Sequence, residues 1–495
     1  MLDCIAAIAT PHGTGGVAVI RLSGTGCLEI AAKMFEPSGR PRGFCGVADK
    51  LTRSVAADGS ATVAEPAFKK PSAGGTAKNH CAAGAADSAI CARSSEYFEP
   101  NRMYPGNIIC DGFTDYGYMV YFKAPKTFTS EDCVEFHCHG GEQISAGVLR
   151  RAIALGARAA ERGEFTRRAF LNGKLSLAAA EGMIEMINAE SSAMLRAGGM
   201  LYREKLTEEV AEIQRSLKDI IAAICAEIDY PEEDLDGLDF KKINARLKIL
   251  REEIATLKDG WARGKRLKNG VSVAICGAPN VGKSSVLNAI LGYDKAIVSP
   301  EAGTTRDIVE GRAEINGVAF DFADTAGIRE NAGAIESAGI ERAKKIASSA
   351  DIILYVFSGD SDGDETAETE LSRLSSGGAK VIKVFNKCDI FPRQSGFNAC
   401  ISAKTGDGLE ELKEKLFEAS FGERANASAV IVEERHYDAL TSALDAIDSA
   451  LGESLTADLV AVDLKEAWEK LGEITGETAG EEIINTVFEK FCVGK

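Results

Sequence analysis

The chain contains the stretch Gly277-Ala278-Pro279-Asn280-Val281-Gly282-Lys283-Ser284, which fits the phosphate-loop pattern G-x-x-x-x-G-K-S. The apolar run 271–276 before it predicts a buried strand, and the run 285–290 after it is helix-like. Glycines let backbone N–H groups curl around phosphate oxygens, Lys283 supplies a point charge, and Ser284 can hold a magnesium ion at a helix start. The alternative is a chance match in a glycine-rich turn, against which the flanking strand and helix argue. The stretch therefore predicts a nucleotide-binding domain.

Three further segments follow in the order that a guanine-nucleotide module requires. Asp324-Thr325-Ala326-Gly327 follows the run 319–323, so a carboxylate can reach the magnesium shell and a glycine lets the backbone approach the γ-phosphate. Asn386-Lys387-Cys388-Asp389 ends the apolar run 380–385, and Ser402-Ala403-Lys404 would complete the base pocket. Asp389 can accept the two N–H donors that guanine shows and adenine lacks, which favours GTP over ATP.

The segment Gly303-Thr304-Thr305-Arg306-Asp307 is of the kind that orders around a γ-phosphate and magnesium, with Thr305 as a candidate magnesium ligand. The same residues also suit an ordinary capped turn. Ile328 stands where Ras-like enzymes carry the glutamine that orients the attacking water, so hydrolysis needs another arrangement. Glu330 and Glu336 lie downstream and are candidates to reach back to the site of hydrolysis. The alternative is that each is a solvated carboxylate on a helix face.

Length and composition limit the class of protein. A chain of 495 residues predicts about three domains, and contents of 45% hydrophobic and 26% charged residues are ordinary for a soluble protein. No apolar run approaches the roughly 20 residues that span a bilayer, and the first 20 residues hold no Lys or Arg. The 13 cysteines show no repeated CxxC spacing. We expect a cytoplasmic protein with reduced thiols, without a leader or a membrane association.

The net charge of −17 argues against a protein that coats nucleic acid nonspecifically. Any RNA contact must use local patches or be shared with a partner. One candidate patch is Arg150, Arg151, Arg158, Arg162, Arg167 and Arg168.

Four neighbouring soft ligands, Cys133, His137, Cys138 and His139, invite a comparison with zinc sites. On a strand, His137 and His139 share one face while Cys138 points away. The favoured interpretation is a strand that ends at Gly140-Gly141, with metal binding as the alternative.

The chain changes character along its length. Residues 3–23 predict a strand, a glycine turn and a second strand, and strand signals return at 118–122 and 134–136. Residues from about 40 to 101 are rich in Ala, Gly, Ser and Pro and predict a flexible insertion. Helical stripes then flank the nucleotide module, which suggests that the module is inserted into a helical domain and enters and leaves it near one place. The stripes are Leu206, Val210, Ile213, Leu217, Ile220, Ile221, Ile224 and Ile228; Ile243, Leu247, Leu250, Ile254, Leu257 and Trp261; and Leu440, Leu444, Ile447, Leu451 and Leu455.

The chain ends in Phe491-Cys492-Val493-Gly494-Lys495, and it also carries Ala7-Ile8-Ala9-Thr10-Pro11 and the run 163–172, GEFTRRAFLN. With these motifs the sequence resembles the MnmE/TrmE family of tRNA uridine-modification GTPases over nearly its whole length. The region 40–101 departs from the family pattern.

The resemblance implies a multidomain α/β and α+β protein. Residues 1–172 would form an α+β tetrahydrofolate-binding and dimerisation domain. Residues 173–267 and 426–495 would form a discontinuous α-helical domain. Residues 268–425 would form an inserted Ras-like P-loop G domain with a doubly wound α/β sheet.

The resemblance also implies roles for single residues. Folate contacts fall on Arg21, Glu135, Lys174 and Lys495, whose types suit a glutamate tail and a pterin, although the first three could be surface charges and Lys495 a frayed terminus. The role of Cys492 stays open. The water-orienting glutamate falls on Glu336. A potassium ion would be held by Asn280, Ser299, Glu301 and Thr304, and magnesium by Ser284 and Thr305. The implied GTP contacts are Asn280, Val281, Gly282, Lys283, Ser284, Ser285, Ser299, Pro300, Glu301, Ala302, Gly303, Thr304, Thr305, Asp324, Thr325, Ala326, Gly327, Asn386, Lys387, Asp389, Ser402, Ala403 and Lys404.

The activity that the resemblance implies is that of a homodimeric, potassium-stimulated GTPase acting on tRNA. With an FAD-dependent MnmG-like partner, in a heterotetramer, it would form the 5-carboxymethylaminomethyl or aminomethyl group on wobble uridine, using a 5-formyl or methylene tetrahydrofolate. The alternatives are a ribosome-assembly or regulatory GTPase without modification chemistry, and a scaffold whose nucleotide is structural.

Overall fold

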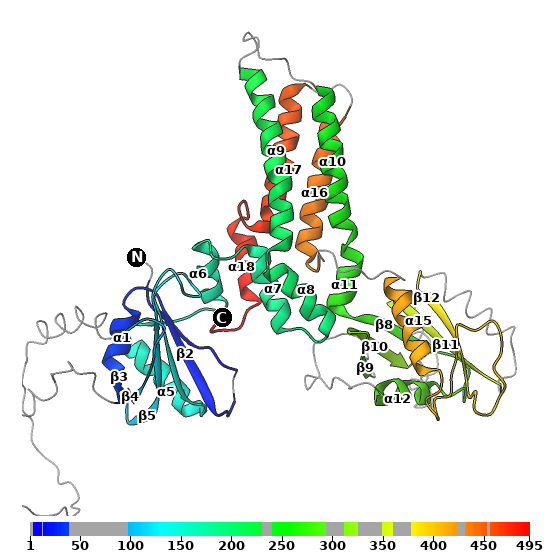
Figure 1. Ribbon diagram of the computed structural model, residues 1–495, viewed down its shortest axis with the longest axis horizontal. Helices are drawn as coiled ribbons and strands as arrows, with labels where there is room; N and C mark the ends of the chain where they lie inside the picture. The colour runs from blue at the N-terminus through cyan, green and yellow to red at the C-terminus, as the bar shows by residue number, and fades with distance from the viewer. Residues whose placement is uncertain are drawn as a thin grey trace, which may run out of the picture. The chain divides into compact units, whose positions relative to one another are not determined.

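The computed structural model describes residues 3–11, 13–38, 98–229, 240–293, 311–324, 349–359, 378–422, 431–452 and 456–495 (Figure 1). The chain divides into two units. One comprises Met1–Lys174 and Phe488–Lys495, and the other comprises Leu175–Val487. The last eight residues therefore belong with the N-terminal unit, whereas the resemblance assigned them to the helical domain.

The N-terminal unit is built on a seven-stranded sheet in the order β3-β4-β5-β6-β2-β1-β7, in which only the β1–β7 pair is parallel. One face of the sheet packs against α1 and α5, because alternate strand residues point to that face. In β6, for example, Phe136 and Cys138 are buried in this core, while Glu135 and His137 lie on the other face. The elements are β1 Ile5–Ile8, β2 Val17–Ser23, α1 Cys27–Met34, β3 Phe35–Pro37, β4 Met103–Cys110, β5 Phe113–Phe122, β6 Cys133–His139, α5 Glu142–Ala154, β7 Arg158–Ala159 and α6 Glu164–Leu171.

The strands expected at 3–23, 118–122 and 134–136 are present as β1, β2, β5 and β6. The sequence patterns did not indicate β4, whose alternation is interrupted by Pro105 and Gly106. Most of the insertion expected at 40–101 lies outside the described residues. Its end is part of the fold, because Phe98 is buried and packs edge-on against Tyr104 with 5.2 Å between the ring centroids.

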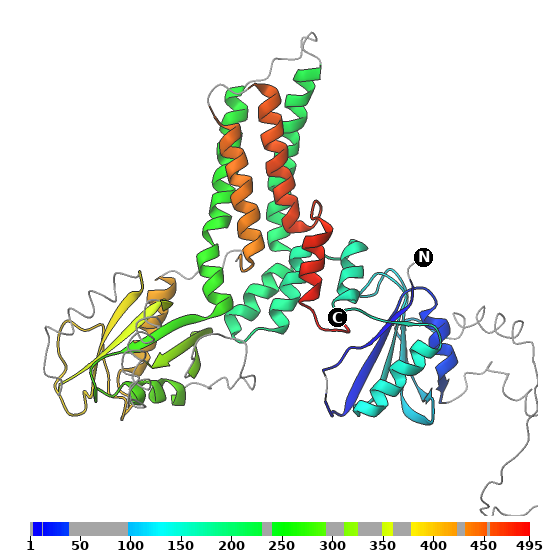
Figure 2. The ribbon, with the colours of Figure 1, turned by 180° about the vertical axis from the view of Figure 1, so that it is seen from behind.

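The second unit begins with helices. In it α17 packs against α16 and α9, and α16 packs against α10, so segments from both sides of the nucleotide module form one bundle (Figures 1 and 2). The core contains all three predicted stripes in large part. The helices are α7 Leu177–Ile187, α8 Ser192–Tyr202, α9 Lys205–Asp229, α10 Phe240–Asp259, α11 Trp261–Asn269, α16 Glu434–Ala450, α17 Ala457–Thr475 and α18 Glu481–Glu489, the last of which crosses into the N-terminal unit.

The stripes differ from expectation at their ends. Ile228 is 37% exposed, one residue before the end of α9. The second stripe is split, since α10 ends at Asp259 and Trp261 begins α11. Leu455 lies outside the described residues.

The nucleotide module contains a six-stranded sheet in the order β13-β12-β11-β8-β10-β9, parallel except for the β9–β10 pair. The chain fills one side of β8 first and the other side afterwards, so the strand order reverses at β8. Ligands of such doubly wound sheets bind at the carboxyl end of the strand where the order reverses. The elements are β8 Val271–Cys276, α12 Lys283–Tyr293, β9 Gly311–Ile315, β10 Val318–Asp324, β11 Ile352–Ser358, β12 Lys380–Asn386, β13 Ala399–Cys400 and α15 Leu409–Phe421.

The module enters and leaves the helical part near one place, as the sequence suggested. Arg266, at the end of α11, donates from Nη1 to the carbonyl oxygen of Ser420 in α15 over 2.8 Å. No helix among the described residues is long and apolar enough to cross a membrane.

Candidate functional site

The phosphate loop follows β8 and has a backbone that only particular residues can adopt. Gly277 has φ +144°, and a Cβ there would lie 2.3 Å from the carbonyl oxygen of Val356. Gly282 has φ +94°, and a Cβ there would lie 2.5 Å from Nδ2 of Asn386. Asn280 also has a left-handed φ of 65°, which asparagine tolerates better than most residues. The glycine spacing in the sequence is therefore required by close contacts.

Lys283 begins α12 and its ammonium lies over the loop. Its Nζ donates to the carbonyl oxygens of Gly277, over 3.1 Å, and Ala278, over 2.8 Å. Ser284 lies in the first turn of the same helix, and the N-terminal end of a helix favours anions through its dipole. Val281 is buried and anchors the loop in the core of the module. This arrangement suits a polyphosphate with a magnesium ion near Ser284.

Asn386 connects the phosphate loop to the segment that was predicted to read the base. Its side chain is 2% exposed; Nδ2 donates to the carbonyl oxygen of Val281 over 2.9 Å, and Oδ1 accepts from the backbone N–H of Ala403 over 3.1 Å. The sequence motif predicted that Asn386 belongs to the site. It did not predict this bridge, because the bridge joins three segments that are far apart in the chain.

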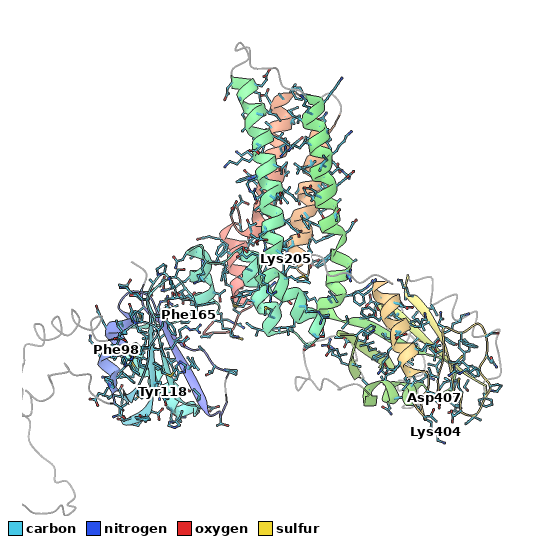
Figure 3. The ribbon with its side chains drawn as sticks, in the orientation of Figure 1. Phe98, Tyr118, Phe165, Lys205, Lys404 and Asp407 are labelled. Carbon is cyan, nitrogen blue, oxygen red and sulfur yellow. The ribbon has the colours of Figure 1, made fainter. Side chains whose placement is uncertain are left out.

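Asp389 is exposed, and one of its oxygens is fixed. Oδ1 accepts from the hydroxyl of Ser402, which is fully buried, over 2.7 Å. Lys387 precedes it with a left-handed φ of 65°. Lys404 lies in the loop between β13 and α15, near Asp407 (Figure 3). The predicted Asn386–Asp389 and Ser402–Lys404 segments thus lie together at the carboxyl ends of β12 and β13.

The predicted switch and catalytic residues lie mostly outside the described part of the chain. These are Ser299, Pro300, Glu301, Ala302, Gly303, Thr304, Thr305, Thr325, Ala326, Gly327, Ile328, Glu330 and Glu336. Asp324 ends β10 and pairs in register with Ile275 of β8, so its backbone lies beside the strand that carries the phosphate loop.

In the N-terminal unit, Arg21 and Glu135 are register partners on β2 and β6. Arg21 Nε donates to Glu135 Oε1 over 2.8 Å, and His137 Nε2 lies 3.5 Å from Oε2. Burial acts to raise the pKa of Glu135, but His137 and Arg21 outweigh it, so the pKa lies below its ordinary value. Glu135 is therefore an ionised, half-buried acceptor.

Two aromatic rings flank the same arginine. The Arg21 guanidinium carbon lies 5.5 Å from the ring centre of Phe128 and 5.8 Å from that of Phe165, which is labelled in Figure 3. No sequence pattern indicated His137, Phe128 and Phe165 as neighbours of this pair. The period-two alternation of β6 could have placed His137 beside Glu135.

Lys174 and the C-terminal segment belong to the same unit as Arg21 and Glu135. Lys174 Nζ donates to the carbonyl oxygen of Thr127 over 2.6 Å. Gly494, next to Lys495, lies so close to β1 that a Cβ on it would be 2.2 Å from the carbonyl oxygen of Ile8. Cys492 is an exposed free thiol.

The Cys133–His139 stretch has contacts of its own. Cys138 is buried in the core, and His139 Nδ1 lies 2.7 Å from Asp115 Oδ1. Within the described ranges there is no group of three or more His, Cys, Asp or Glu side chains placed to hold a metal ion.

A phosphate loop at the strand-order reversal of a parallel sheet, followed by a carboxylate-bearing base segment, defines a P-loop GTPase. Two family models match the chain: the MnmE helical domain over residues 177–492, and the GTP-binding protein TrmE N-terminus over residues 4–65 and 74–174. The chain belongs to the MnmE family.

Curated relatives of this family align along the full chain. A protein from Azoarcus sp. named tRNA modification GTPase MnmE is 34% identical, covering 100% of this chain and 98% of the relative. The protein of the same name from Geobacter sulfurreducens is 33% identical, covering 100% of this chain and 99% of the relative. A solved structure of Aquifex aeolicus Era bound to GDP and AlF4− is 29% identical, covering 35% of this chain and 66% of that chain, with a TM-score of 0.24.

Proposed function

We propose that this chain hydrolyses GTP to drive the modification of the wobble uridine of certain tRNAs. The observation that carries the GTP assignment is the Asp389–Ser402 pair at the base segment, which is joined to the phosphate loop through Asn386. Full-length relatives that are named tRNA modification GTPases support the choice of substrate.

The residues of the phosphate loop would bind and orient the nucleotide. Lys283 would exchange its bonds to the loop carbonyls for phosphate oxygens, and Asp389 would accept from guanine. Ser284, at the positive end of α12, suits a magnesium ligand, with Thr305 as its partner. Asn280 suits a potassium ligand, because its left-handed turn presents an exposed amide at the loop, with Ser299, Glu301 and Thr304 as partners. The two cations would supply positive charge near the β- and γ-phosphates, as an arginine finger does elsewhere.

Glu336 would orient the attacking water in place of the glutamine that Ile328 replaces. We expect Glu336→Ala to keep its affinity for GTP and to lose about 100-fold or more in turnover, the usual range for a lost general base or water-orienting group. Turnover and affinity are measured on the same purified protein in potassium and in sodium buffers. Wild-type turnover in the variant would exclude this role.

The N-terminal unit would bind a 5-formyl or methylene tetrahydrofolate, which would supply the one-carbon unit. Glu135 is an ionised acceptor suited to the amino and ring N–H groups of a pterin, and His137 offers a further polar atom beside it. Lys174 and Lys495 are cations of the same unit and suit a glutamate tail. Carbon transfer to uridine would also require a flavin protein resembling MnmG, bound to a homodimer of this chain in the cytoplasm.

Mass analysis of wobble nucleosides tests the proposal. Cells that lack this chain should accumulate unmodified wobble uridine, and the wild-type gene should restore the modified nucleoside, whereas the Glu336→Ala gene should not. Unchanged uridine in the deletion strain, with no redundant pathway, would contradict the proposal. If the purified chain also fails to bind a tetrahydrofolate, a ribosome-assembly or regulatory GTPase would be the better description.

A further inference from the structure

Two free cysteines lie in or next to the two segments that are proposed to bind the guanine base, Asn386–Asp389 and Ser402–Lys404. Cys388 lies inside the Asn386–Asp389 motif, and Cys400 ends β13 two residues before Ser402. Both side chains are half-buried, so each is within reach of a small molecule in solution. The GTPase role assigns no task to either thiol.

The backbone holds these two residues close together. Cys400 is the register partner of Phe385 in the β12–β13 pair. The backbone N–H of Cys388 donates to the carbonyl oxygen of Ile401 over 3.1 Å, and the N–H of Ile401 donates to that of Phe385 over 2.8 Å. The thiol of Cys388 lies 3.6 Å from this same Phe385 oxygen.

The two side chains are also near each other. Burial raises the pKa of the Cys388 thiol above its ordinary value, and the charge of the neighbouring Cys400 raises it further. The Cys400 thiol itself donates to the carbonyl oxygen of Gln394 over 3.5 Å. The raised pKa disfavours the Cys388 thiolate, so thiol exchange at this residue should become faster as the pH rises.

We propose that Cys388 and Cys400 form a reversible disulfide that links the two base-reading segments and lowers the affinity for guanine nucleotides. The effect on affinity rests on the proposed recognition of guanine by Asp389. The disulfide itself would be a regulatory modification site of this chain.

The chemistry balances with a small-molecule disulfide as the oxidant. One thiolate attacks the oxidant, forms a mixed disulfide and releases one small thiol. The second cysteine then displaces the other small thiol and closes the Cys388–Cys400 bond. Two cysteine thiols and one oxidant disulfide thus yield one protein disulfide and two small thiols, and an excess of the small thiol reverses the reaction.

The loss of affinity follows from what the new bond would move. A disulfide needs about 2.05 Å between the sulfurs and a dihedral angle near 90°, so the Cys388 sulfur must leave the Phe385 carbonyl and approach Cys400. Hydrogen bonds to Val281 and Ala403 hold Asn386 in place. The backbone of Cys388 and of the adjacent Asp389 must therefore move instead. The Asp389 carboxylate would then leave the position that Ser402 fixes.

Peptide mapping of the full chain tests whether the bond forms. Trypsin cleaves after Lys387, Arg393 and Lys404, so the two thiols fall in separate peptides, 388–393 and 394–404. After equilibration with oxidised glutathione, the wild-type protein should yield these two peptides joined, and Cys388→Ser or Cys400→Ser should yield none. Absence of the joined peptides from fully oxidised wild-type protein overturns the proposal.

Nucleotide affinity of the same samples tests the consequence. A fluorescent GDP analogue should bind the oxidised wild-type chain at least about tenfold more weakly than the reduced chain, the effect of losing one well-made hydrogen bond to the base. Excess reduced thiol should restore the affinity. Cys388→Ser and Cys400→Ser should bind equally well in both conditions, whereas Cys225→Ser, which removes an exposed thiol on α9, should respond as the wild type does.

The outcomes separate the two claims. An affinity that stays unchanged in protein with the joined peptides overturns the regulatory role. An equal loss in Cys400→Ser places the effect elsewhere and also overturns it. Failure of the reduced wild-type chain to bind any guanine nucleotide refutes the proposed function itself, and the inference with it.

Discussion

At the scale of single residues, the proposed base recognition would depend on one carboxylate, Asp389, whose direction is set by the hydroxyl of Ser402. Asp389→Asn replaces an acceptor by an amide that can turn donors toward the guanine donors. We expect GTP affinity to fall by about 100-fold or more, because the guanine donors would lose their acceptor and face amide donors instead. Xanthosine triphosphate carries a carbonyl where guanine carries its amino group, so its affinity should rise. Competition against a fluorescent nucleotide measures both values.

The matched control is Ser402→Ala. This change keeps the Asp389 carboxylate but removes the hydroxyl that fixes its direction. Its GTP affinity should fall by only about tenfold, as for one lost hydrogen bond, with no gain for xanthosine triphosphate. Equal GTP affinity in Asp389→Asn and wild type would show that Asp389 does not read the base.

The phosphate loop gives a second prediction at this scale. Gly282→Ala places a methyl group 2.5 Å from Asn386 Nδ2, which is a steric clash. It also forces an alanine into a backbone φ of +94°, which L-residues rarely adopt. We expect a loss of about 1–3 kcal/mol in the free energy of unfolding and a large loss of nucleotide affinity. Urea titration and nucleotide binding measure these.

Gly292→Ala is the control, because it lies in the same helix α12 and a Cβ there meets nothing within 4 Å. This change should stabilise the chain by about 0.4–1 kcal/mol. If the two variants behaved alike, the close contact at Gly282 would have no energetic role.

The sequence predicted the members of the base site better than their connections. The spacing around Asp389 and Ser402 indicated which residues would meet, since both follow strands of one parallel sheet. The Asn386 bridge and the proximity of Cys388 to Cys400 could not be predicted, because each depends on how separate loops pack.

At the scale of elements, a buried ion pair joins α7, which precedes the nucleotide module in the chain, to α16, which follows it. Glu181 of α7 is 1% exposed and accepts from Arg435 Nε over 2.9 Å and Nη2 over 2.6 Å. His436 Nε2 lies 2.7 Å from Glu181 Oε2. Burial acts to raise the pKa of Glu181, but His436 and Arg435 outweigh it, so the pKa lies well below its ordinary value.

Glu181→Gln should therefore destabilise the chain in a manner that depends on pH. A lowered folded-state pKa gives stability that is complete above the ordinary value of 4.5 and is lost as the pH falls below it. At pH 7 the variant should lose about 3–5 kcal/mol, the cost of breaking a buried pair. The difference from wild type should shrink between pH 5 and pH 3, as measured by urea unfolding at each pH.

Asp445→Asn, at an exposed position on α16, serves as the control and should stay within about 0.5 kcal/mol of wild type at every pH. A constant difference between Glu181→Gln and wild type across this range would mean that charge on Glu181 does not stabilise the helices. The helical stripes predicted the bundle from period alone. They could not indicate the Glu181–Arg435 pair, because its members are polar and 254 residues apart.

At the scale of the whole molecule, the end of the chain completes the unit with which the chain begins. Phe491 is buried in the N-terminal unit, its ring centre lies 5.8 Å from that of Phe488, and its carbonyl oxygen accepts from Arg162 Nε over 3.1 Å. No local sequence pattern indicates this closure. Only tertiary contacts assign the segment to the sheet domain.

Phe491→Ala should destabilise the N-terminal unit selectively, by the roughly 3–5 kcal/mol that a buried Phe-to-Ala change costs. The two tryptophans, Trp261 and Trp468, both lie in the second unit, so their fluorescence follows the unfolding of that unit. Labelling of the buried thiols Cys4 and Cys27 follows the unfolding of the N-terminal unit.

The Phe491→Ala variant should expose these thiols at a lower temperature while its tryptophan transition and its affinity for GTP stay unchanged. Val493→Ala, 52% exposed, should alter neither probe. A joint shift of both probes in Phe491→Ala would show instead that the two units unfold as one.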